Sequence, residues 1–150
     1  MRRTLAVITT IAALATACGG TTSGSSAPKS PYSLGFTTDL SASSAYLGQS
    51  LKYGFQGYIE ALNSKGGVNG HKIEVTYLDD ALQNDRGVAN FQQLTTQGKP
   101  LAVTGEVQSN VCNAMSALSN ERKIPTVCFS AGLDQEHTKY TFAVLINAAF

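Results

Sequence analysis

The sequence lacks an excess of charge of either sign. Its 150 residues include 11 Lys and Arg and 10 Asp and Glu, and these are spread along the chain without a basic cluster or an acidic run. Domains that bind nucleic acids usually gather positive charge on one face. The composition therefore argues against a nucleic acid partner, and we expect none.

Motifs of several enzyme classes are also absent. The chain contains no G-x-S-x-G nucleophile elbow, no H-E-x-x-H zinc motif and no G-K-[ST] phosphate loop. The glycines within 66–70 do not have the G-x-G-x-x-G spacing of a dinucleotide-binding loop. We interpret both histidines, His71 and His137, as surface residues rather than metal ligands. The sequence thus predicts a protein that is not an enzyme and that uses no cofactor or metal.

Long hydrophobic runs are lacking except near the amino end. Leu5 to Ala17 form an apolar stretch of thirteen residues, preceded by Arg2 and Arg3. This length suits the apolar region of a secretory signal peptide, whereas a membrane-spanning helix requires about 20 residues. We predict that residues 1–17 are a signal peptide.

Cys18 directly follows three small residues, in an arrangement that resembles a bacterial lipobox. The resemblance implies cleavage before Cys18 and attachment of a diacylglyceryl group, which would hold the protein on the extracytoplasmic side of the membrane. Ala15 stands where a lipobox usually has Leu, and the alternative is an ordinary signal peptide with an incidental cysteine. Residues 18–32 are rich in Gly, Ser and Thr, so we predict a flexible tether there.

From Ser33 onward, short apolar runs alternate with amphipathic segments. Strands are expected at 33–37, 71–78, 101–103, 124–129 and 140–146. Between them, apolar residues recur at helical spacing: Leu47, Leu51, Phe55, Tyr58 and Leu62 first, then Val88, Phe91 and Leu94, then Val111, Ala114, Met115 and Leu118. This alternation predicts an α/β fold with a doubly wound parallel sheet, in one domain over 33–150.

Such sheets bind ligands at the loops outside the carboxyl ends of their strands. These loops are expected at 38–44, 79–84, 104–110 and 130–139. The sequence Gln108-Ser109-Asn110 enters a helix, whose unpaired N–H groups and partial positive charge can hold a carboxylate. An ordinary helix cap explains these three residues equally well.

Asp79 and Asp80 end an expected strand. A carboxylate pair in this place can serve catalysis or bind a metal. Hydrogen bonding to the backbone amides of a loop is the interpretation that we favour.

Two cysteines remain once Cys18 is set aside, Cys112 and Cys128. Exported proteins can form disulfides. Cys112 falls in the first turns of the expected third helix and Cys128 falls late in the fourth strand, which places both at the same edge of a parallel sheet. A disulfide and two free thiols are both compatible with this placement.

Two neighbouring motifs carry a family resemblance. The first expected helix ends in Asn63-Ser-Lys-Gly-Gly-Val-Asn-Gly70, and the strand after it ends in Leu78-Asp-Asp80. This pattern resembles the amino-terminal lobe of the type I solute-binding proteins of ABC importers, in particular the leucine/isoleucine/valine-binding family. The resemblance extends over 33–144. It implies a two-lobed protein that closes on a small solute, so the chain looks truncated, with its second lobe missing.

The resemblance also implies which residues meet the solute. A Ser or Thr at a helix N-terminus holds the carboxylate of the solute in this family, and the backbone of the next loop contributes as well. The matching residues here, with those at the mouth of the cleft, are Asp39, Ser41, Gln108, Ser109, Asn110, Ser130, Ala131 and Gly132. Amino-acid binders of this family often have a Ser-rich first loop and Ser-Pro-Gly-Ala-Thr in the second. The corresponding segments here, 106–110 and 130–134, differ from both, which argues against a branched-chain amino acid in particular.

The function implied is that of a lipid-anchored extracytoplasmic solute-binding protein. It would deliver a small polar solute, such as an amino acid, an amide or a related organic acid, to the permease subunits of an ABC importer. Two alternatives stay open: a sensory ligand-binding domain of a membrane receptor, and an exported hydrolase that uses Asp79 or Asp80. Turnover of a small ester, amide or glycoside would favour the hydrolase.

Overall fold

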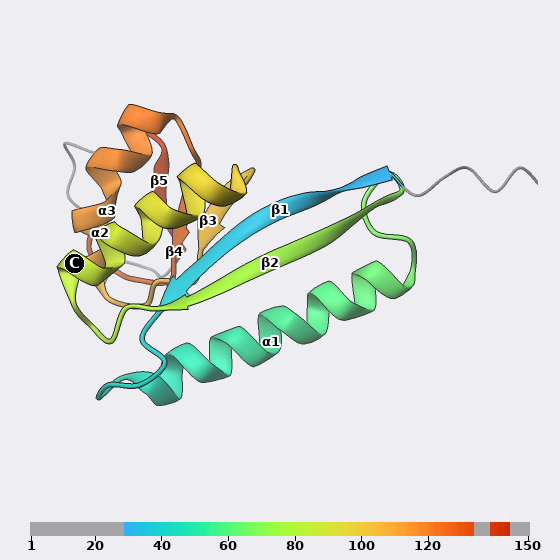
Figure 1. Ribbon diagram of the computed structural model, residues 1–150. Coiled ribbons are helices and arrows are strands. Elements are labelled where there is room, and N and C mark those ends of the chain that lie inside the picture. The colour runs from blue at the N-terminus through green and yellow to red at the C-terminus, as the bar shows by residue number, and fades with distance from the viewer. Residues whose placement is uncertain (1–28, 134–138, 145–150) are drawn as a thin grey trace, which may run out of the picture.

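The computed structural model describes residues 29–133 and 139–144, which form one parallel sheet with helices on both faces (Figure 1). The strand order is β2-β1-β3-β4-β5, and each strand runs parallel to its neighbours. The strands are β1 (Lys29–Thr38), β2 (His71–Asp79), β3 (Ala102–Thr104), β4 (Thr126–Cys128) and β5 (Thr141–Ala143). The predicted α/β fold with a doubly wound parallel sheet is confirmed.

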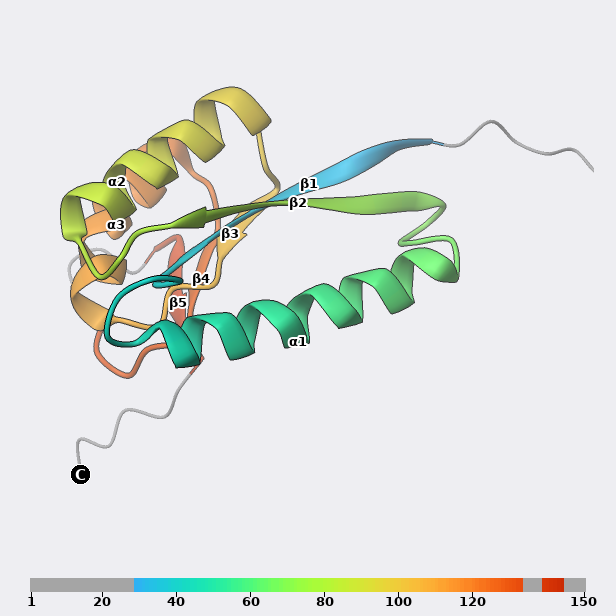
Figure 2. The same cartoon turned by 60° about the horizontal axis from the view of Figure 1, so that its bottom comes forward.

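Three helices connect the first four strands. Helix α1 (Ala45–Ser64) lies on one face of the sheet, and α2 (Asn84–Gln93) and α3 (Ser109–Arg122) lie on the other (Figure 2). A π-helical turn, η1 (Leu94–Gly98), extends α2. Because the strands are parallel, the loops that lead into the three helices all emerge at the carboxyl edge of the sheet.

Strand β1 begins earlier than the sequence predicts. The expected strand was limited to 33–37 and the tether extended to residue 32, but β1 already pairs with β2 at Lys29, opposite His71. The ring of Tyr32 stacks on the His71 ring with centroids 4.3 Å apart. Pairing and stacking therefore place residues 29–32 in the sheet rather than in a flexible tether.

The boundaries of the later strands also differ from the prediction. The observed strands are β3 at Ala102–Thr104 rather than 101–103, β4 at Thr126–Cys128 rather than 124–129, and β5 at Thr141–Ala143 rather than 140–146. Pro125 has no N–H to donate to a neighbouring strand, which explains why β4 begins after it. His137 and the last two residues of the fifth expected strand lie outside the described residues.

The buried face of α1 keeps three members of the predicted stripe, since Leu51, Phe55 and Leu62 are half-buried, but it departs from the stripe at the other two. Leu47 and Tyr58 are 44% and 67% exposed, whereas Gly48 and Ile59 are buried. A Cβ on Gly48 would lie 2.0 Å from the backbone oxygen of Asp39. The close approach of α1 to this loop turns the glycine inward, and the larger apolar residue beside it faces solvent.

The apolar core lies between the sheet and the pair α2 and α3. Its buried members are Phe91, Leu94, Val103, Val111 and Met115. These include Phe91 of α2 and Leu94 of η1, both from the second expected helix, and two of the four residues that the helical spacing predicts for α3. On the other face of the sheet, the rings of Phe36 and Phe55 pack with centroids 5.4 Å apart.

A disulfide joins the start of α3 to the end of β4. It links Cys112 and Cys128, whose Cα atoms are 6.3 Å apart, and neither side chain is exposed. This separation is within the usual range for a disulfide. Of the two possibilities that the sequence leaves open, the structure shows the bonded pair.

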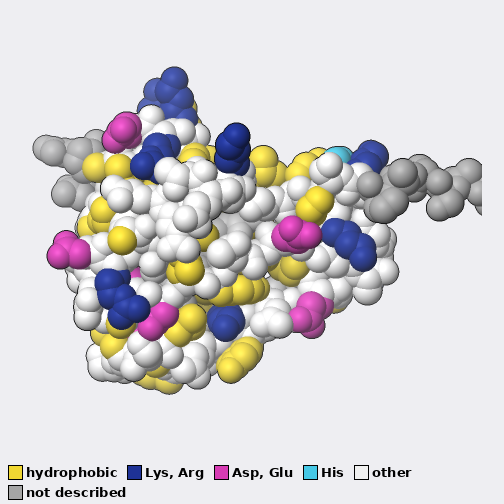
Figure 3. All heavy atoms as spheres, viewed as in Figure 1, with side chains coloured by type: hydrophobic (Ala, Val, Ile, Leu, Met, Phe, Trp, Pro, Cys, Tyr) yellow, Lys and Arg dark blue, Asp and Glu magenta, His cyan; other side chains and the backbone are white. Residues whose placement is uncertain are grey.

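The face of the molecule in Figure 3 shows no large area of one charge. On the face in Figure 3, Lys and Arg side chains alternate with Asp and Glu. Among the described helices, none combines the length and the hydropathy needed to cross a membrane.

Candidate functional site

Polar side chains are buried where the strands end at the carboxyl edge. The buried polar residues of this edge are Thr37, Thr38, Asp39, Asp80, Glu106 and Ser130. Burial of polar groups is unfavourable unless hydrogen bonds compensate for the lost water. The hydrogen bonds of this edge therefore show how the loops are held.

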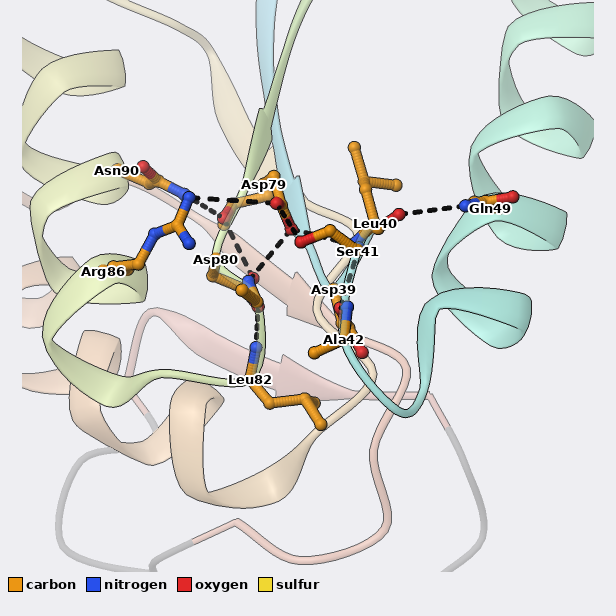
Figure 4. Close-up of polar contacts among 12 residues, drawn as sticks. Asp39, Leu40, Ser41, Ala42, Gln49, Asp79, Asp80, Leu82, Arg86 and Asn90 are labelled. Atoms are coloured by element: carbon orange, nitrogen blue, oxygen red, sulfur yellow. Dashed lines mark hydrogen bonds and ion pairs between the residues drawn. The ribbon is translucent and has the colours of Figure 1, made fainter.

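Asp39 organises the loop between β1 and α1. Its carboxylate accepts hydrogen bonds from the backbone N–H groups of Ser41, Ala42 and Ser44, at 3.0, 2.6 and 2.8 Å (Figure 4). Ser44 precedes α1 and makes no side-chain cap of its own. Asp39 therefore fixes the entry into α1 from five residues upstream.

Asp79 ties the same loop to the end of β2. It accepts hydrogen bonds from the Leu40 N–H at 2.8 Å and from the Ser41 hydroxyl at 2.6 Å. Partial burial disfavours its charged form, but the hydrogen bonds from Ser41, Leu40 and Ala81 and the charge of Arg86, 3.8 Å away, together lower the pKa of Asp79. The structure thus gives Asp79 the loop-binding role that we favoured, and the Ser41 hydroxyl expected at the mouth of the cleft is bonded to it.

Asp80 points into the molecule, in contrast to Asp79. It is fully buried and accepts hydrogen bonds from the Thr37 hydroxyl at 3.2 Å and from the Leu82 N–H at 3.0 Å. Within the described parts of the chain, no group of three or more His, Cys, Asp and Glu side chains is placed to hold a metal ion.

Glu106 is a buried acid to which the sequence alone assigns no role. It is 1% exposed, and its Oε1 accepts the Gln108 N–H at 2.7 Å. Burial, a side-chain hydrogen bond with Asp80 and the charge of Asp80 raise the pKa of Glu106 to about 9. The sequence feature that could have pointed to this burial is the glycine before it. In the structure Gly105 has a φ of +105°, a conformation that favours glycine, and this turns the chain inward.

The three predicted residues at the start of α3 contact three different loops. Gln108 donates through Nε2 to the Ser44 hydroxyl over 3.0 Å, and the amide of Asn110 donates to Asn84 over 2.9 Å. Ser44 stands directly before α1 and Asn84 is the first residue of α2, so these two hydrogen bonds hold the entrances of α1, α2 and α3 together. Asn110 and Gln108 therefore act in the structure as ties between loops.

Ser109 contacts the loop after β4, in which the resemblance places the other residues that would meet the solute. Its Oγ accepts the Gly132 N–H at 3.1 Å. Of the other two residues predicted in that loop, Ala131 is exposed, while Ser130 is only 2% exposed. Ser109, Ala131 and Gly132 are thus brought together at the surface of this edge, with Ser130 beneath them.

This arrangement can bind an anion. The first turn of α3 has no side-chain cap in the described structure, so it leaves N–H groups without a side-chain partner at the positive end of the helix dipole. The Ser109 oxygen uses a lone pair for Gly132, which leaves its O–H hydrogen available to donate. A carboxylate placed here would receive both kinds of hydrogen bond.

Two hollows lie away from this edge. One of about 240 Å³ is lined by residues of β1, α2 and η1, including Leu34, Gln93 and Gly98. A more open one of about 630 Å³ lies at the amino ends of β1 and β2, beside Lys29 and Lys72. Neither is lined by a predicted site residue, so we do not assign the solute to them.

Comparison with solved structures finds similar chains. The branched-chain amino acid transporter substrate binding protein LivJ from Streptococcus pneumoniae, solved with isoleucine, is 27% identical with a TM-score of 0.72, over 77% of this chain and 34% of that one. A solute binding protein of an ABC transporter from Rhodopseudomonas palustris, solved with 3,4-dihydroxybenzoic acid, is 24% identical with a TM-score of 0.67, over 75% and 32%. The leucine binding protein LivK from Thermotoga maritima is 22% identical with a TM-score of 0.67, over 77% and 33%.

The likeness to the last two shows the fold alone, and this chain spans about one third of the length of each of the three. No curated protein matches. A family model described as periplasmic binding protein matches residues 31–149, which is most of the sequence. The chain therefore belongs to the periplasmic binding protein family.

Proposed function

We propose that this chain provides the solute-contacting edge of a lipid-anchored, extracytoplasmic binding protein of an ABC importer. The solute is a small polar molecule with an anionic group, such as an amino acid, an amide or a related organic acid. The permease subunits of the importer are the protein partners, and the protein catalyses no reaction.

The observation that carries this proposal is the contact between Ser109 and Gly132. It joins the uncapped N-terminus of α3 to the loop after β4: the Gly132 N–H donates to Ser109 Oγ, and the Ser109 hydroxyl hydrogen and the unpaired N–H groups of the first turn of α3 are the donors left at this place. Helix N-termini are common binding sites for anions. The carboxylate of isoleucine in LivJ and that of 3,4-dihydroxybenzoate in the Rhodopseudomonas palustris protein are of this chemistry.

Replacement of Ser109 by alanine tests the solute site. The variant loses a hydroxyl donor, and a hydrogen bond to a charged group contributes about 1.5–3 kcal/mol, so we expect the dissociation constant to rise roughly tenfold or more. The measurement is calorimetric titration with isoleucine, leucine, glutamine and 3,4-dihydroxybenzoate. A solute that binds the native chain in this titration is then titrated against each variant.

Two further variants serve as controls. Ser109→Thr keeps the hydroxyl and should retain most of the affinity. Ser50→Ala removes the same atom from an exposed site on α1, where the hydroxyl bonds only to the Tyr46 carbonyl, and should leave the affinity unchanged. An unaltered affinity of Ser109→Ala would exclude this hydroxyl from the site.

The anchor is tested separately at Cys18. Acyl chains contribute about 0.8 kcal/mol for each buried methylene, and stable attachment requires more than one chain or a second signal. We expect Cys18→Ser to move the exported protein from the membrane fraction to the soluble fraction. The measurement is immunoblotting after fractionation of cells that express the full chain. Equal membrane association of the variant would contradict lipidation.

A further inference from the structure

Glu106 occupies a central position beneath the candidate site. Gly105 directs it inward, since a Cβ on that glycine would lie 2.6 Å from the ring of Phe36. The Glu106 side chain accepts the Gln108 N–H, and its backbone carbonyl accepts the Phe129 N–H at 2.6 Å. One residue thus contacts both the entry into α3 and the chain that leaves β4.

The second carboxyl oxygen of Glu106 has no hydrogen-bond donor. Oε2 is buried and finds no donor among the described residues, while the fully buried Asp80 is the carboxyl group that interacts with this side chain. Two ionised carboxylates in contact repel each other strongly when they are shielded from water. A proton on Oε2 removes this conflict, because it turns an acceptor without a partner into a donor toward Asp80.

We propose that Glu106 is a positioning residue of the solute site, whose protonated carboxyl donates a hydrogen bond to Asp80. The pair couples the loop after β2 to the loop that leads into α3. Asp80 in turn receives the Leu82 N–H, so the bond connects backbone on both sides. Glu106 holds this proton whether or not a solute is present. Only the effect of the Glu106–Asp80 hydrogen bond on solute binding rests on the proposed function.

The other charged groups of this edge are engaged elsewhere. Asp39 is bonded to three N–H groups of its own loop. Asp79 is bonded to Leu40 and Ser41 and lies 3.8 Å from Arg86. The first turn of α3 carries no acidic residue, and β4 ends in the disulfide-bonded Cys128. Asp80 is therefore the charged group that acts on Glu106.

The arrangement sets a direction for the effect of pH. Burial first, and then the contact with Asp80, raise the pKa of Glu106 to about 9, although the N–H groups of Gln108 and Val107 oppose this. Glu106 is therefore neutral at pH 7. In alkaline solution the proton is lost, the two carboxylates repel each other and the loops separate.

Carbon-13 NMR of the full chain, with its Glu carboxyl carbons labelled, measures the titration of Glu106 directly. Glu106→Gln identifies the signal by its disappearance. We expect a midpoint of about 9 in the native chain. In Asp80→Asn the midpoint should fall by roughly one unit or more, because the neighbouring charge is gone.

Amide hydrogen exchange tests the coupling between the loops. Glu106→Gln keeps the shape of the side chain and a donor toward Asp80, but it does not ionise. We expect the Leu82 and Gln108 amides of the native chain to lose protection relative to Glu106→Gln by about tenfold for each pH unit between the ordinary pKa of 4.5 and the midpoint, and to lose no more above it, because Glu106 is then ionised in the closed and the opened loops alike. Both chains are compared at the same pH, which cancels the intrinsic dependence of exchange on pH.

Each result decides the inference. A Glu106 midpoint near the ordinary value of 4.5 overturns it, and so does a midpoint near 9 that Asp80→Asn leaves unchanged. Equal exchange in the native chain and in Glu106→Gln overturns the coupling of the loops. A chain that titrates as expected but binds none of the solutes contradicts the proposed function and leaves this inference standing.

Discussion

Removal of the disulfide by the double substitution Cys112→Ala and Cys128→Ala is expected to lower the free energy of unfolding by about 3 kcal/mol. The bond closes a loop with a sequence separation of 16, and a crosslink of this length restricts the unfolded chain by about that amount. Two sulfur atoms also leave the buried interior, which adds a smaller cost. Urea denaturation followed by circular dichroism gives the value.

The same experiment in the presence of a reductant provides the control. The native chain should lose most of the same stability, falling short of the double variant by the smaller cost of the missing sulfur atoms, while the double variant should not respond to the reductant. Free thiols are counted in a Cys18→Ser background, so that only the pair contributes. Two thiols that react in the native, unreduced protein would show that the bond is not formed.

The disulfide also supports the candidate site. Cys112 lies three residues after Ser109, and Cys128 lies four residues before Gly132. The bond therefore holds together the two segments whose contact carries the proposed function. Loss of the bond should weaken solute binding as well as stability, and the calorimetric titration of the double variant measures this second effect.

The arrangement of elements could be predicted because its signals are local. Strand segments and helical spacing alternate clearly from Ser33 onward, and parallel strands joined by helices permit few topologies. The face of α1 could be predicted only in part, because Leu47 and Tyr58 of the expected stripe are exposed. Tyr58 fits the apolar spacing as well as Ile59 does, and the choice depends on how closely the backbone at Gly48 approaches Asp39.

The candidate site was predictable in place but not in its internal bonds. A parallel sheet brings the loops before α1, α2 and α3 to one edge, so Ser109 and Gly132 could be expected near each other. The partner of Ser41 is Asp79 at the end of β2, and the partner of Asn110 is Asn84 at the start of α2, at sequence separations of 38 and 26. No local pattern encodes contacts of this range.

Glu106 shows most clearly what the sequence alone could not predict. A single acidic residue in a polar loop usually faces solvent, and the sequence alone assigns no role to this one. Its burial depends on the positive φ of Gly105 and on the position of Phe36 in a distant strand. Only the folded chain reveals that this acid lies beside Asp80.

Replacement of Gly48 by alanine is expected to destabilise the protein by about 3 kcal/mol. The added methyl group would lie 2.0 Å from the backbone oxygen of Asp39 and 3.0 Å from its carbonyl carbon, and backbone atoms move less easily than the end of a side chain. Overpacking of this kind usually costs about 1–3 kcal/mol. The start of α1 must shift, and the hydrogen bond from Gln49 to the Leu40 carbonyl, 2.9 Å long, is strained as well.

Gly54 offers a matched control within the same helix. A Cβ at Gly54 meets nothing within 4 Å, so Gly54→Ala should stabilise the protein by about 0.5–1 kcal/mol through its higher helix propensity. The two substitutions are chemically identical, and their opposite signs in urea denaturation would isolate the close approach at Asp39. Equal effects of the two variants would contradict this packing. Since Asp39 orders the loop at the candidate site, Gly48→Ala should also reduce the affinity for the solute, whereas Gly54→Ala should not.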